Sequence, residues 1–212
     1  MYSKNKRNEY CLICFKHLLE KYGFYNLIFR HHCICISCLS KFKDFLIKEK
    51  IDGVEYFYLY QYNTFFKDLL FQYKGLYDIA LKDIFLYKYH NYLKRKYKDY
   101  IIVVAPSSAL DNRKRGFAPM FEIASTLNLP IYSGLHKLNN YKQANVLFKE
   151  RSAIKDNLGI NAGKNIFNKK VVLIDDVITS GYTIKACINL LKQQNPKKIK
   201  VLIIAKNQKG KR

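Results

Sequence analysis

Residues 171–183, with the sequence VVLIDDVITSGYT, constrain the fold more than any other part of the chain. An aliphatic run ends in two adjacent acids and is followed at once by small hydroxyl residues and a glycine. Such a run is typical of a strand buried on both faces of a parallel sheet. The next residues, TIKACINLLKQQ, have helical periodicity. The segment therefore predicts a strand, a tight turn and a helix.

Similar patterns surround this unit. YIIVVAP at 100–106 and KIKVLIIA at 198–205 predict two more buried strands. SSALDNRKRGF at 107–117 is interpreted as a polar loop, and FEIASTLNLP at 121–130 as a helix. Alternating strands and helices with right-handed crossovers predict an α/β fold, an open parallel sheet with helices on both faces. Ligands of such sheets bind at the carboxyl ends of the strands.

The first half of the chain is rich in aromatic residues. VEYFYLYQY at 54–62 predicts a strand, and NTFFKDLLFQYKG at 63–75 a helix that ends at Gly75. Helical spacing continues over 76–97, where Ile79, Leu81, Ile84, Phe85 and Tyr89 can share one face. FKDFLIKEK at 42–50 is also interpreted as a helix, which ends before Asp52-Gly53. We expect these aromatic side chains to form core and not to stack on bases.

Five of the six cysteines lie between residues 11 and 38. Two C-x-x-C pairs in a protein with reduced thiols indicate a tetrahedral zinc site. The expected ligands are Cys11, Cys14, Cys35 and Cys38, because Cys33 lacks the two-residue spacing. Cys33, His31 and His32 are other candidate ligands. The alternative to a zinc site is a redox-active C-x-x-C pair or a set of packed free thiols. Four thiolates leave no open position, so the metal would stabilise the module and not catalyse.

The charge of the chain is strongly positive, with 38 basic and 16 acidic side chains and a formal net charge of +22. Such a balance favours a polyanionic partner. Alternatively, part of the lysine excess reflects the nucleotide composition of an AT-rich genome, since Lys, Asn, Ile, Tyr and Phe are all abundant. We expect no signal peptide, because the start MYSKNKRNEY is polar and charged, and no membrane span, because no apolar run reaches the roughly 20 residues needed. We expect a cytoplasmic protein, with association at the inner face of the membrane left open.

The acids at Asp175 and Asp176 limit the ligand that this strand end can bind. Backbone N–H groups around Gly181 at the start of the helix favour a phosphate. Two carboxylates beside a phosphate alone would repel it. A ribose 5-phosphate removes the conflict, because its hydroxyl groups donate to the carboxylates while the turn binds its phosphate. If other substituents of the ligand bind Mg²⁺, the positive charge of this ion also stabilises the two carboxylates.

Three other interpretations of the acid pair fit less well. A response-regulator receiver carries its acids near the start of the domain, whereas only 36 residues follow Asp176 and none of them is acidic. A Walker A loop would need a G-K-S/T sequence, which does not follow. An acidic strand end that merely caps a helix is the remaining alternative.

VVLIDDVITSGYT resembles the phosphoribosyl pyrophosphate (PRPP) signature of type I phosphoribosyltransferases. The N-terminal cysteines, R-K-R-G-F at 113–117, Y-K-Q at 141–143 and Arg151, in this order, are similar to the ComF competence proteins. The resemblance implies a zinc-ribbon-like module at 1–45 and a phosphoribosyltransferase-like domain at 54–212. It assigns catalysis to Asp175 and Asp176, and the pyrophosphate side to Ser107, Ser108, Arg113 and Arg115. It assigns PRPP binding to Asp175, Asp176, Val177, Thr179, Ser180, Gly181, Tyr182 and Thr183.

The sequence departs from this pattern at three places. Val104-Ala105-Pro106 keeps one of two usual prolines, and Ala118-Pro119 replaces Asn-Gln after R-G-F. Both changes lie where such folds hold pyrophosphate, so turnover is less expected than binding. Thr179 stands where purine-salvage members place an aspartate that serves as general base, which argues against that subclass.

Two functions follow from the resemblance. The preferred one is a competence protein that binds PRPP or a related sugar phosphate with Mg²⁺ and assists uptake of single-stranded DNA in natural transformation. Its implied partners are single-stranded DNA and a DNA-uptake helicase or membrane channel. The alternative is an active phosphoribosyltransferase that transfers ribose 5-phosphate from PRPP to an unidentified acceptor. Mg²⁺ and Arg113, Lys114 or Arg115 would then stabilise the leaving pyrophosphate.

Overall fold

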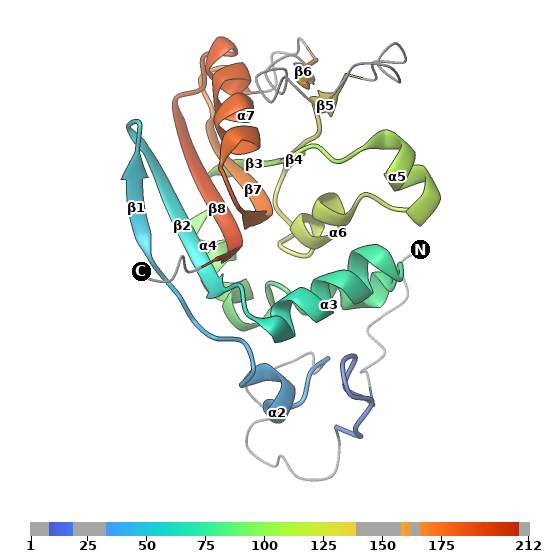
Figure 1. The fold of residues 1–212 in the computed structure, drawn as a ribbon. Coiled ribbons are helices and arrows are strands. Elements are labelled where there is room, and N and C mark those ends of the chain that lie inside the picture. Colours follow the sequence, from blue (N-terminus) through green and yellow to red (C-terminus); the bar gives the residue numbers. More distant parts are fainter. Residues whose placement is uncertain (1–8, 19–32, 139–157, 162–165, 208–212) are drawn as a thin grey trace.

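The computed structural model describes residues 9–18, 33–138, 158–161 and 166–207. Its centre is a six-stranded sheet in the order β1-β2-β8-β7-β3-β4 (Figure 1). All neighbouring strands are parallel except β1, which pairs antiparallel with β2 at one edge. The strands are β1 (Lys48–Ile51), β2 (Val54–Gln61), β3 (Tyr100–Val104), β4 (Ile131–Tyr132), β7 (Lys170–Ile178) and β8 (Lys198–Lys206). The α/β class with a mostly parallel sheet is confirmed.

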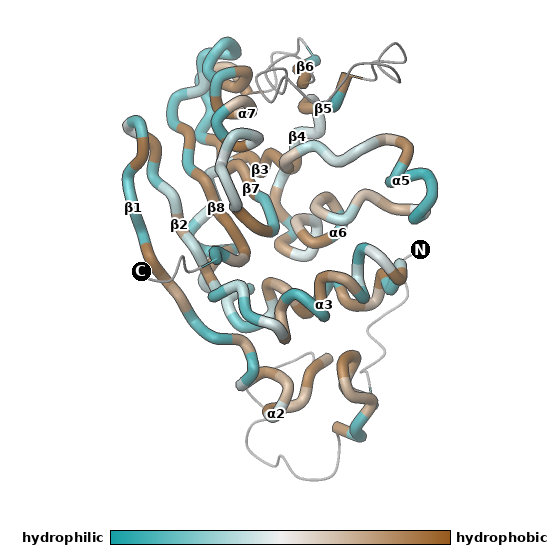
Figure 2. The backbone as a smooth tube through the Cα atoms, viewed as in Figure 1, coloured by the Kyte–Doolittle hydropathy of each residue, from teal (hydrophilic) through white to brown (hydrophobic). Residues whose placement is uncertain are grey.

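Apolar runs place β7 and β8 in the middle of the sheet. Residues 171–174 of β7 and 201–205 of β8 are fully buried, and Figure 2 shows β8 in hydrophobic colours, whereas β1 at the edge is largely hydrophilic. Helix α7 (Tyr182–Gln193) covers one face. The other face packs against α3 (Thr64–Gly75), α4 (His90–Lys96) and α6 (Pro119–Ser125). The expected helices on both faces are therefore present.

Residues 76–97 were expected to continue as a helix, and this prediction is only partly right. The segment forms two short 3-10 helices, η1 (Ile79–Asp83) and η2 (Tyr87–Tyr89), before α4. A left-handed backbone at Tyr77 (φ 63°) interrupts the helix, and the Asp78 side chain accepts the N–H of Ala80 to start the next turn. Leu81, Ile84 and Phe85 are buried as expected, whereas Ile79 is 43% exposed.

The helix expected over residues 42–50 is wrong. This segment is extended and runs beside β2, where the backbone N–H groups of Phe45 and Leu46 donate to the Leu59 carbonyl. Its end forms β1, and Asp52-Gly53 makes the hairpin turn, with both residues at positive φ (48° and 81°). Backbone pairing with β2 therefore overrides the local helical spacing.

The loop expected over 107–117 is also wrong, because it contains α5 (Ala109–Arg115). The Ser108 side chain accepts the N–H of Asp111 at the start of this helix, and Gly116 ends it in the left-handed conformation (φ 78°). A separate two-stranded sheet joins β5 (Leu135–Lys137) and β6 (Leu158–Ile160).

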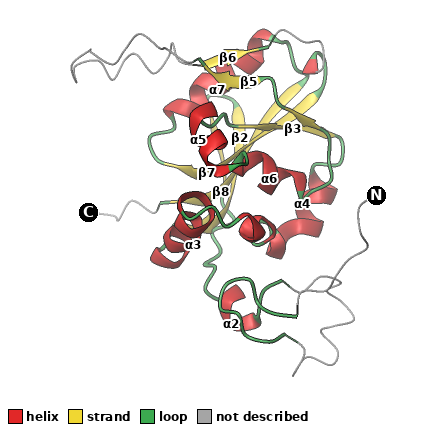
Figure 3. Ribbon diagram, turned by 90° about the vertical axis from the view of Figure 1, so that its right-hand side faces the viewer, coloured by secondary structure: helices red, strands yellow, loops and turns green. Residues whose placement is uncertain are grey.

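The N-terminal module contains α2 (Ile36–Leu39) and lies against α3, away from the strands (Figures 1 and 3). Phe42 joins the two parts, with its ring centroid 5.0 Å from that of Tyr60 and 5.2 Å from that of Phe65. The domain boundaries at residues 45 and 54 stay a prediction, and β1 lies between them. In the part of the chain that the structure describes, no helix is long and apolar enough to cross a membrane.

Candidate functional site

The acid pair lies near the carboxyl end of β7, between the neighbouring strands β3 and β8. The strand was expected to end at the acids, but it continues to Ile178, and Asp175 still pairs with Ile203 of β8. Because successive strand residues point to opposite faces, the two carboxylates diverge. Asp176 points toward α3 and Asp175 toward α7. The structure thus separates two groups that the sequence analysis treated as one acceptor.

Asp176 is ion-paired with Lys74, which lies in the last turn of α3. The residue is 9% exposed, and its second oxygen, Oδ1, accepts the N–H of Val177 at 2.8 Å. Both carboxylate oxygens of Asp176 therefore have partners. A buried carboxylate of this kind depends on its counter-ion, because a lone charge is costly to remove from water.

Asp175 is more weakly satisfied. Its Oδ1 accepts the N–H of Asp176 at 2.9 Å, and Oδ2 makes no hydrogen bond within the described part of the chain. Burial raises the pKa of Asp175 to about 6, against the opposing effect of Lys74 and Lys137. Burial, with the nearby charges of Arg115 and Lys137, lowers the pKa of Lys74 to about 8, although Asp175 opposes this. Lys74 and Lys137 therefore act on Asp175, and Arg115 lies near Lys74.

The loop that follows the acids turns at a glycine before α7. Gly181 precedes α7 at φ 76°, a backbone conformation that favours glycine. Thr179, Ser180 and Thr183 are exposed, and no described residue accepts or donates a hydrogen bond to their side chains. Tyr182 is 67% exposed, and Val177 is half-buried. The free N–H groups at the start of α7 and these hydroxyls can donate to an anion.

The residues expected on the pyrophosphate side follow β3, the neighbour of β7. Ser107 Oγ donates to Asn112 Oδ1 at 2.8 Å, and Ser108 caps α5. Arg113 is exposed. Arg115 donates from Nε to the Lys74 carbonyl at 2.9 Å, which ties α5 to the end of α3. Tyr141, Gln143 and Arg151 lie outside the described residues.

Two residues near the acids, Lys74 and Lys137, could not be predicted from the sequence. Lys74 stands 102 positions before Asp176, and Lys137 ends β5 in the small second sheet. Each is one lysine among many in a lysine-rich chain, so no local pattern marks it. Only the packing of α3 and of the second sheet near β7 brings their charges to the acids.

The structure brings together the four cysteines expected to bind metal. The Sγ atoms of Cys11, Cys14, Cys35 and Cys38 all lie within 4.8 Å of one another. The first pair sits in a turn closed by the Phe15 N–H and the Cys11 carbonyl. In the second pair, the N–H of Cys38 donates to Cys35 Sγ at 3.4 Å. Four convergent thiols can hold a structural metal such as zinc.

Cys33, the fifth cysteine of the described module, does not join this cluster. Cys33 is 5% exposed, and burial raises the pKa of its thiol to about 12, which keeps it protonated. By contrast, a hydrogen bond from the Lys16 backbone lowers the pKa of the exposed Cys14 thiol to about 7. His31 and His32 lie outside the described residues. The two-residue spacing thus selects the four cysteines that converge.

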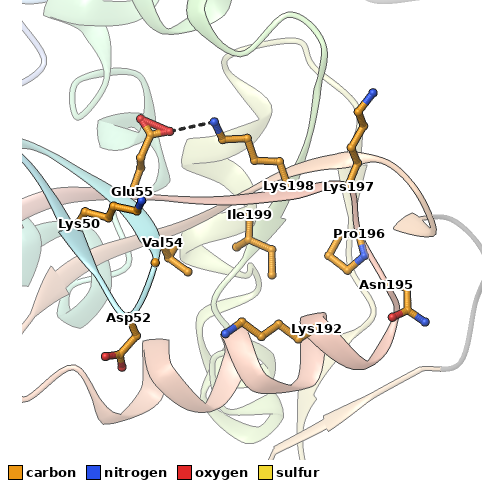
Figure 4. A pocket seen from close by; sticks show the side chains of 11 residues that line it. Lys50, Asp52, Val54, Glu55, Lys192, Asn195, Pro196, Lys197, Lys198 and Ile199 are labelled. Atoms are coloured by element: carbon orange, nitrogen blue, oxygen red, sulfur yellow. Dashed lines mark ion pairs between the residues drawn. The ribbon is translucent and has the colours of Figure 1, made fainter.

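A basic cavity of about 700 Å³ lies at the opposite, amino-terminal edge of the sheet (Figure 4). It is formed by the β1–β2 turn, the end of α7 and the start of β8. Lys198 is paired there with Glu55 at 3.3 Å. Lys50, Lys192 and Lys197 have no acidic partner among the described residues. The cavity therefore has a surplus of positive charge that faces solvent.

The chain shows similarity to several known proteins. The family model of the phosphoribosyl transferase domain matches residues 113–212. Competence protein ComFC of Streptococcus pneumoniae R6 is 26% identical over 221 residues, covering 92% of this chain and 99% of that protein. Competence protein ComFC of Bacillus subtilis 168 is 25% identical over 158 residues, 72% of this chain and 63% of that protein. A hypoxanthine phosphoribosyltransferase structure from Staphylococcus aureus gives a TM-score of 0.39 at 12% identity, covering 59% of this chain and 62% of that one.

Proposed function

Because this chain is a ComF family protein, a homologue of the ComFC competence proteins with a phosphoribosyltransferase-like domain, we propose that it acts in natural transformation. In this proposal it binds PRPP or a related sugar phosphate with Mg²⁺ and assists the uptake of single-stranded DNA. A zinc-stabilised module at 1–45 would be joined to a phosphoribosyltransferase-like domain at 54–212. A DNA-uptake helicase or membrane channel is the proposed protein partner.

One observation carries the ligand proposal. The carboxyl end of the central strand β7 carries Asp175 and Asp176, one on each face, and a glycine turn follows whose hydroxyls make no hydrogen bond to a described residue. Ligands of parallel sheets bind at this edge. Asp175 and Asp176 would accept hydrogen bonds from the ribose hydroxyls, and residues 179–183 would bind the 5-phosphate.

The residues present also fit Mg²⁺, which prefers oxygen ligands and keeps several waters. Oδ2 of Asp175 makes no hydrogen bond to a described residue. It lies near the carboxyl end of β7, where it could accept a hydrogen bond from a water molecule bound to Mg²⁺. Mg²⁺ bound to the pyrophosphate would neutralise part of its charge, and Lys74, Arg115 and Lys137 would add to this field.

Calorimetry with PRPP in the presence of Mg²⁺ tests the ligand proposal. We expect binding of one PRPP per chain, and weaker binding when Mg²⁺ is removed. Ribose without phosphate is the control and should not bind measurably, because it lacks the anion that the turn at Gly181 would hold. Absence of any heat with PRPP, with a correctly folded protein, would contradict the proposal.

The alternative function is enzymatic, the displacement of pyrophosphate at the anomeric carbon of PRPP. The nucleophile would form the new bond to this carbon, pyrophosphate would leave with the electron pair of the broken C–O bond, and the nucleophile would lose a proton. Arg113, Lys114 or Arg115 would help to stabilise the leaving group. Release of pyrophosphate across a panel of acceptors tests this function, and silence on all of them would refute it for those acceptors.

The basic cavity supports the proposed contact with single-stranded DNA, because unpaired lysines can bind successive phosphates. We expect the triple variant Lys50→Gln, Lys192→Gln and Lys197→Gln to bind single-stranded DNA about 10-fold more weakly at low salt. With about 0.7 counterions released per phosphate, the slope of log affinity against log salt should fall by about 2. Fluorescence anisotropy of a labelled oligonucleotide measures both quantities.

A matched variant controls for the loss of charge. Lys43, Lys67 and Lys94 are exposed and do not line the cavity, so their replacement by glutamine removes three charges elsewhere. We expect this control to keep most of the affinity. An equal loss in both variants would reject the cavity as the DNA site, and no binding by the wild type at low salt would reject the DNA contact itself.

A further inference from the structure

Lys74 reaches the acid pair from outside the region that matches the phosphoribosyl transferase domain, which begins at residue 113. It belongs to α3, which lies between the sheet and the cysteine module (Figure 1). Its Nζ is paired with Asp176 in a partly buried contact, with side chains 29% and 13% exposed. A lysine from a separate element has therefore become part of this site.

The backbone around Lys74 is held firmly. The Lys74 carbonyl accepts the Nε–H of Arg115 at 2.9 Å. Its neighbour Tyr73 is fully buried, donates its hydroxyl to the Pro119 carbonyl at 2.8 Å and packs against Phe117. These contacts join the end of α3 to α5 and α6, on the side of the site where pyrophosphate is expected. The backbone of Lys74 is thus fixed by these contacts, and its ammonium is anchored by the ion pair with Asp176.

The pairing has a consequence for the ligand. Both oxygens of Asp176 are occupied, one by Lys74 and one by the N–H of Val177. A ribose hydroxyl that donates to Asp176 must share or replace the Lys74 contact. The ammonium then needs another anion, since a buried cation without a partner is costly. Arg115, one of the residues expected to bind pyrophosphate, contacts the Lys74 carbonyl, so the pyrophosphate of the ligand would lie near the Lys74 ammonium.

We propose that Lys74 is the resident counter-ion of Asp176 and the residue that gives the site its preference for PRPP over ribose 5-phosphate. On ligand binding its ammonium passes from the carboxylate to the pyrophosphate, and Asp176 becomes free to accept from the ribose. This part of the inference rests on the proposed function, whereas the counter-ion role concerns the ligand-free protein.

Two measurements on the same variants test the two parts. In the ligand-free protein, Lys74→Gln should lower the melting temperature by about 3–8 °C, because a partly buried carboxylate loses its partner. The double variant with Asp176→Asn should melt close to Asp176→Asn alone, since the two residues act as one pair. Additive effects of the two substitutions would overturn the counter-ion role.

Calorimetry with Mg²⁺ then compares two ligands. Lys74→Gln should weaken PRPP binding about 10-fold, because one charge-assisted hydrogen bond is lost. The affinity for ribose 5-phosphate should stay within about threefold of the wild-type value. Lys74→Arg keeps the charge and should restore most of the preference. Lys67→Gln, on the exposed side of the same helix, should change neither affinity.

Each outcome of the calorimetry decides the inference. Equal weakening of both ligands by Lys74→Gln would show a general structural role and overturn the specificity role, as would no change in either. If the wild type binds neither ligand, the proposed function fails and the ligand-binding role of Lys74 fails with it. The counter-ion role is then still decided by the melting temperatures.

Discussion

Replacing Cys38 with serine should remove the bound metal and unfold the N-terminal module. Cys38 is 2% exposed and contributes one of four thiols that lie within 4.8 Å of one another. Serine is a poor ligand for zinc, so only three thiolate ligands would remain. Structural zinc sites contribute about 10–16 kcal/mol of apparent binding energy in finger peptides. We therefore expect metal content to fall from one per chain to near zero.

Metal analysis after dialysis measures this loss, and hydrogen exchange over residues 9–18 and 33–45 should show that amide protection falls there. The metal would be identified as zinc by the same analysis. Cys33→Ser and Cys187→Ser are matched controls, because both thiols are buried and free but stand outside the cluster. They should keep the metal. Full metal content in Cys38→Ser, or its loss in Cys33→Ser, would refute the assigned ligands.

Replacing Asp175 or Asp176 with asparagine should weaken PRPP binding about 10- to 100-fold each, since a hydrogen bond to a charged group contributes about 1.5–3 kcal/mol. The amide keeps the shape of the side chain but loses the charge and one acceptor. Asp176→Asn also releases Lys74 from its ion pair. Calorimetry with PRPP and Mg²⁺ measures the change. Asp99→Asn, an exposed acid, is the control and should bind as the wild type does.

The Asp175 substitution also has a pH signature. Burial raises the pKa of Asp175 to about 6 in the free protein, and ribose hydroxyls would donate to its ionised form. Below this pKa the ligand must first displace a proton, so affinity should rise with pH up to about 6 and then level off. PRPP itself titrates, so the test is the difference between wild type and Asp175→Asn. Identical pH profiles would remove Asp175 from the ribose site.

Much of the fold could be predicted because the signals are local. The apolar run before Asp175 can only be buried on both faces, and the glycine at 181 marks the turn before α7. Spacing also selected Cys35 over Cys33, since two thiols three positions apart can face one ion from a single turn. In each case the physical cause lies within a few residues of the pattern.

Two failures have the opposite origin. Residues 42–50 have helical spacing, but the N–H groups of Phe45 and Leu46 donate to the Leu59 carbonyl of β2. An N–H group that bonds to β2 cannot also form a helical hydrogen bond. Residues 107–117 are polar on every side, so no apolar stripe marked α5. Its signals were the cap at Ser108 and the glycine at 116, which are weak without a buried face.

The sequence by itself determined the strands β2, β3, β7 and β8, the turn at Gly181, the thiol spacing and the acid pair, because periodicity, burial and turn chemistry are properties of neighbouring residues. Only the tertiary structure decided how the acids are used. Strand alternation sends Asp175 and Asp176 to opposite faces, and the docking of α3 pairs Asp176 with a lysine 102 residues away. Charge acts through space and not along the chain, so the counter-ion of a buried carboxylate becomes visible only after the elements have packed.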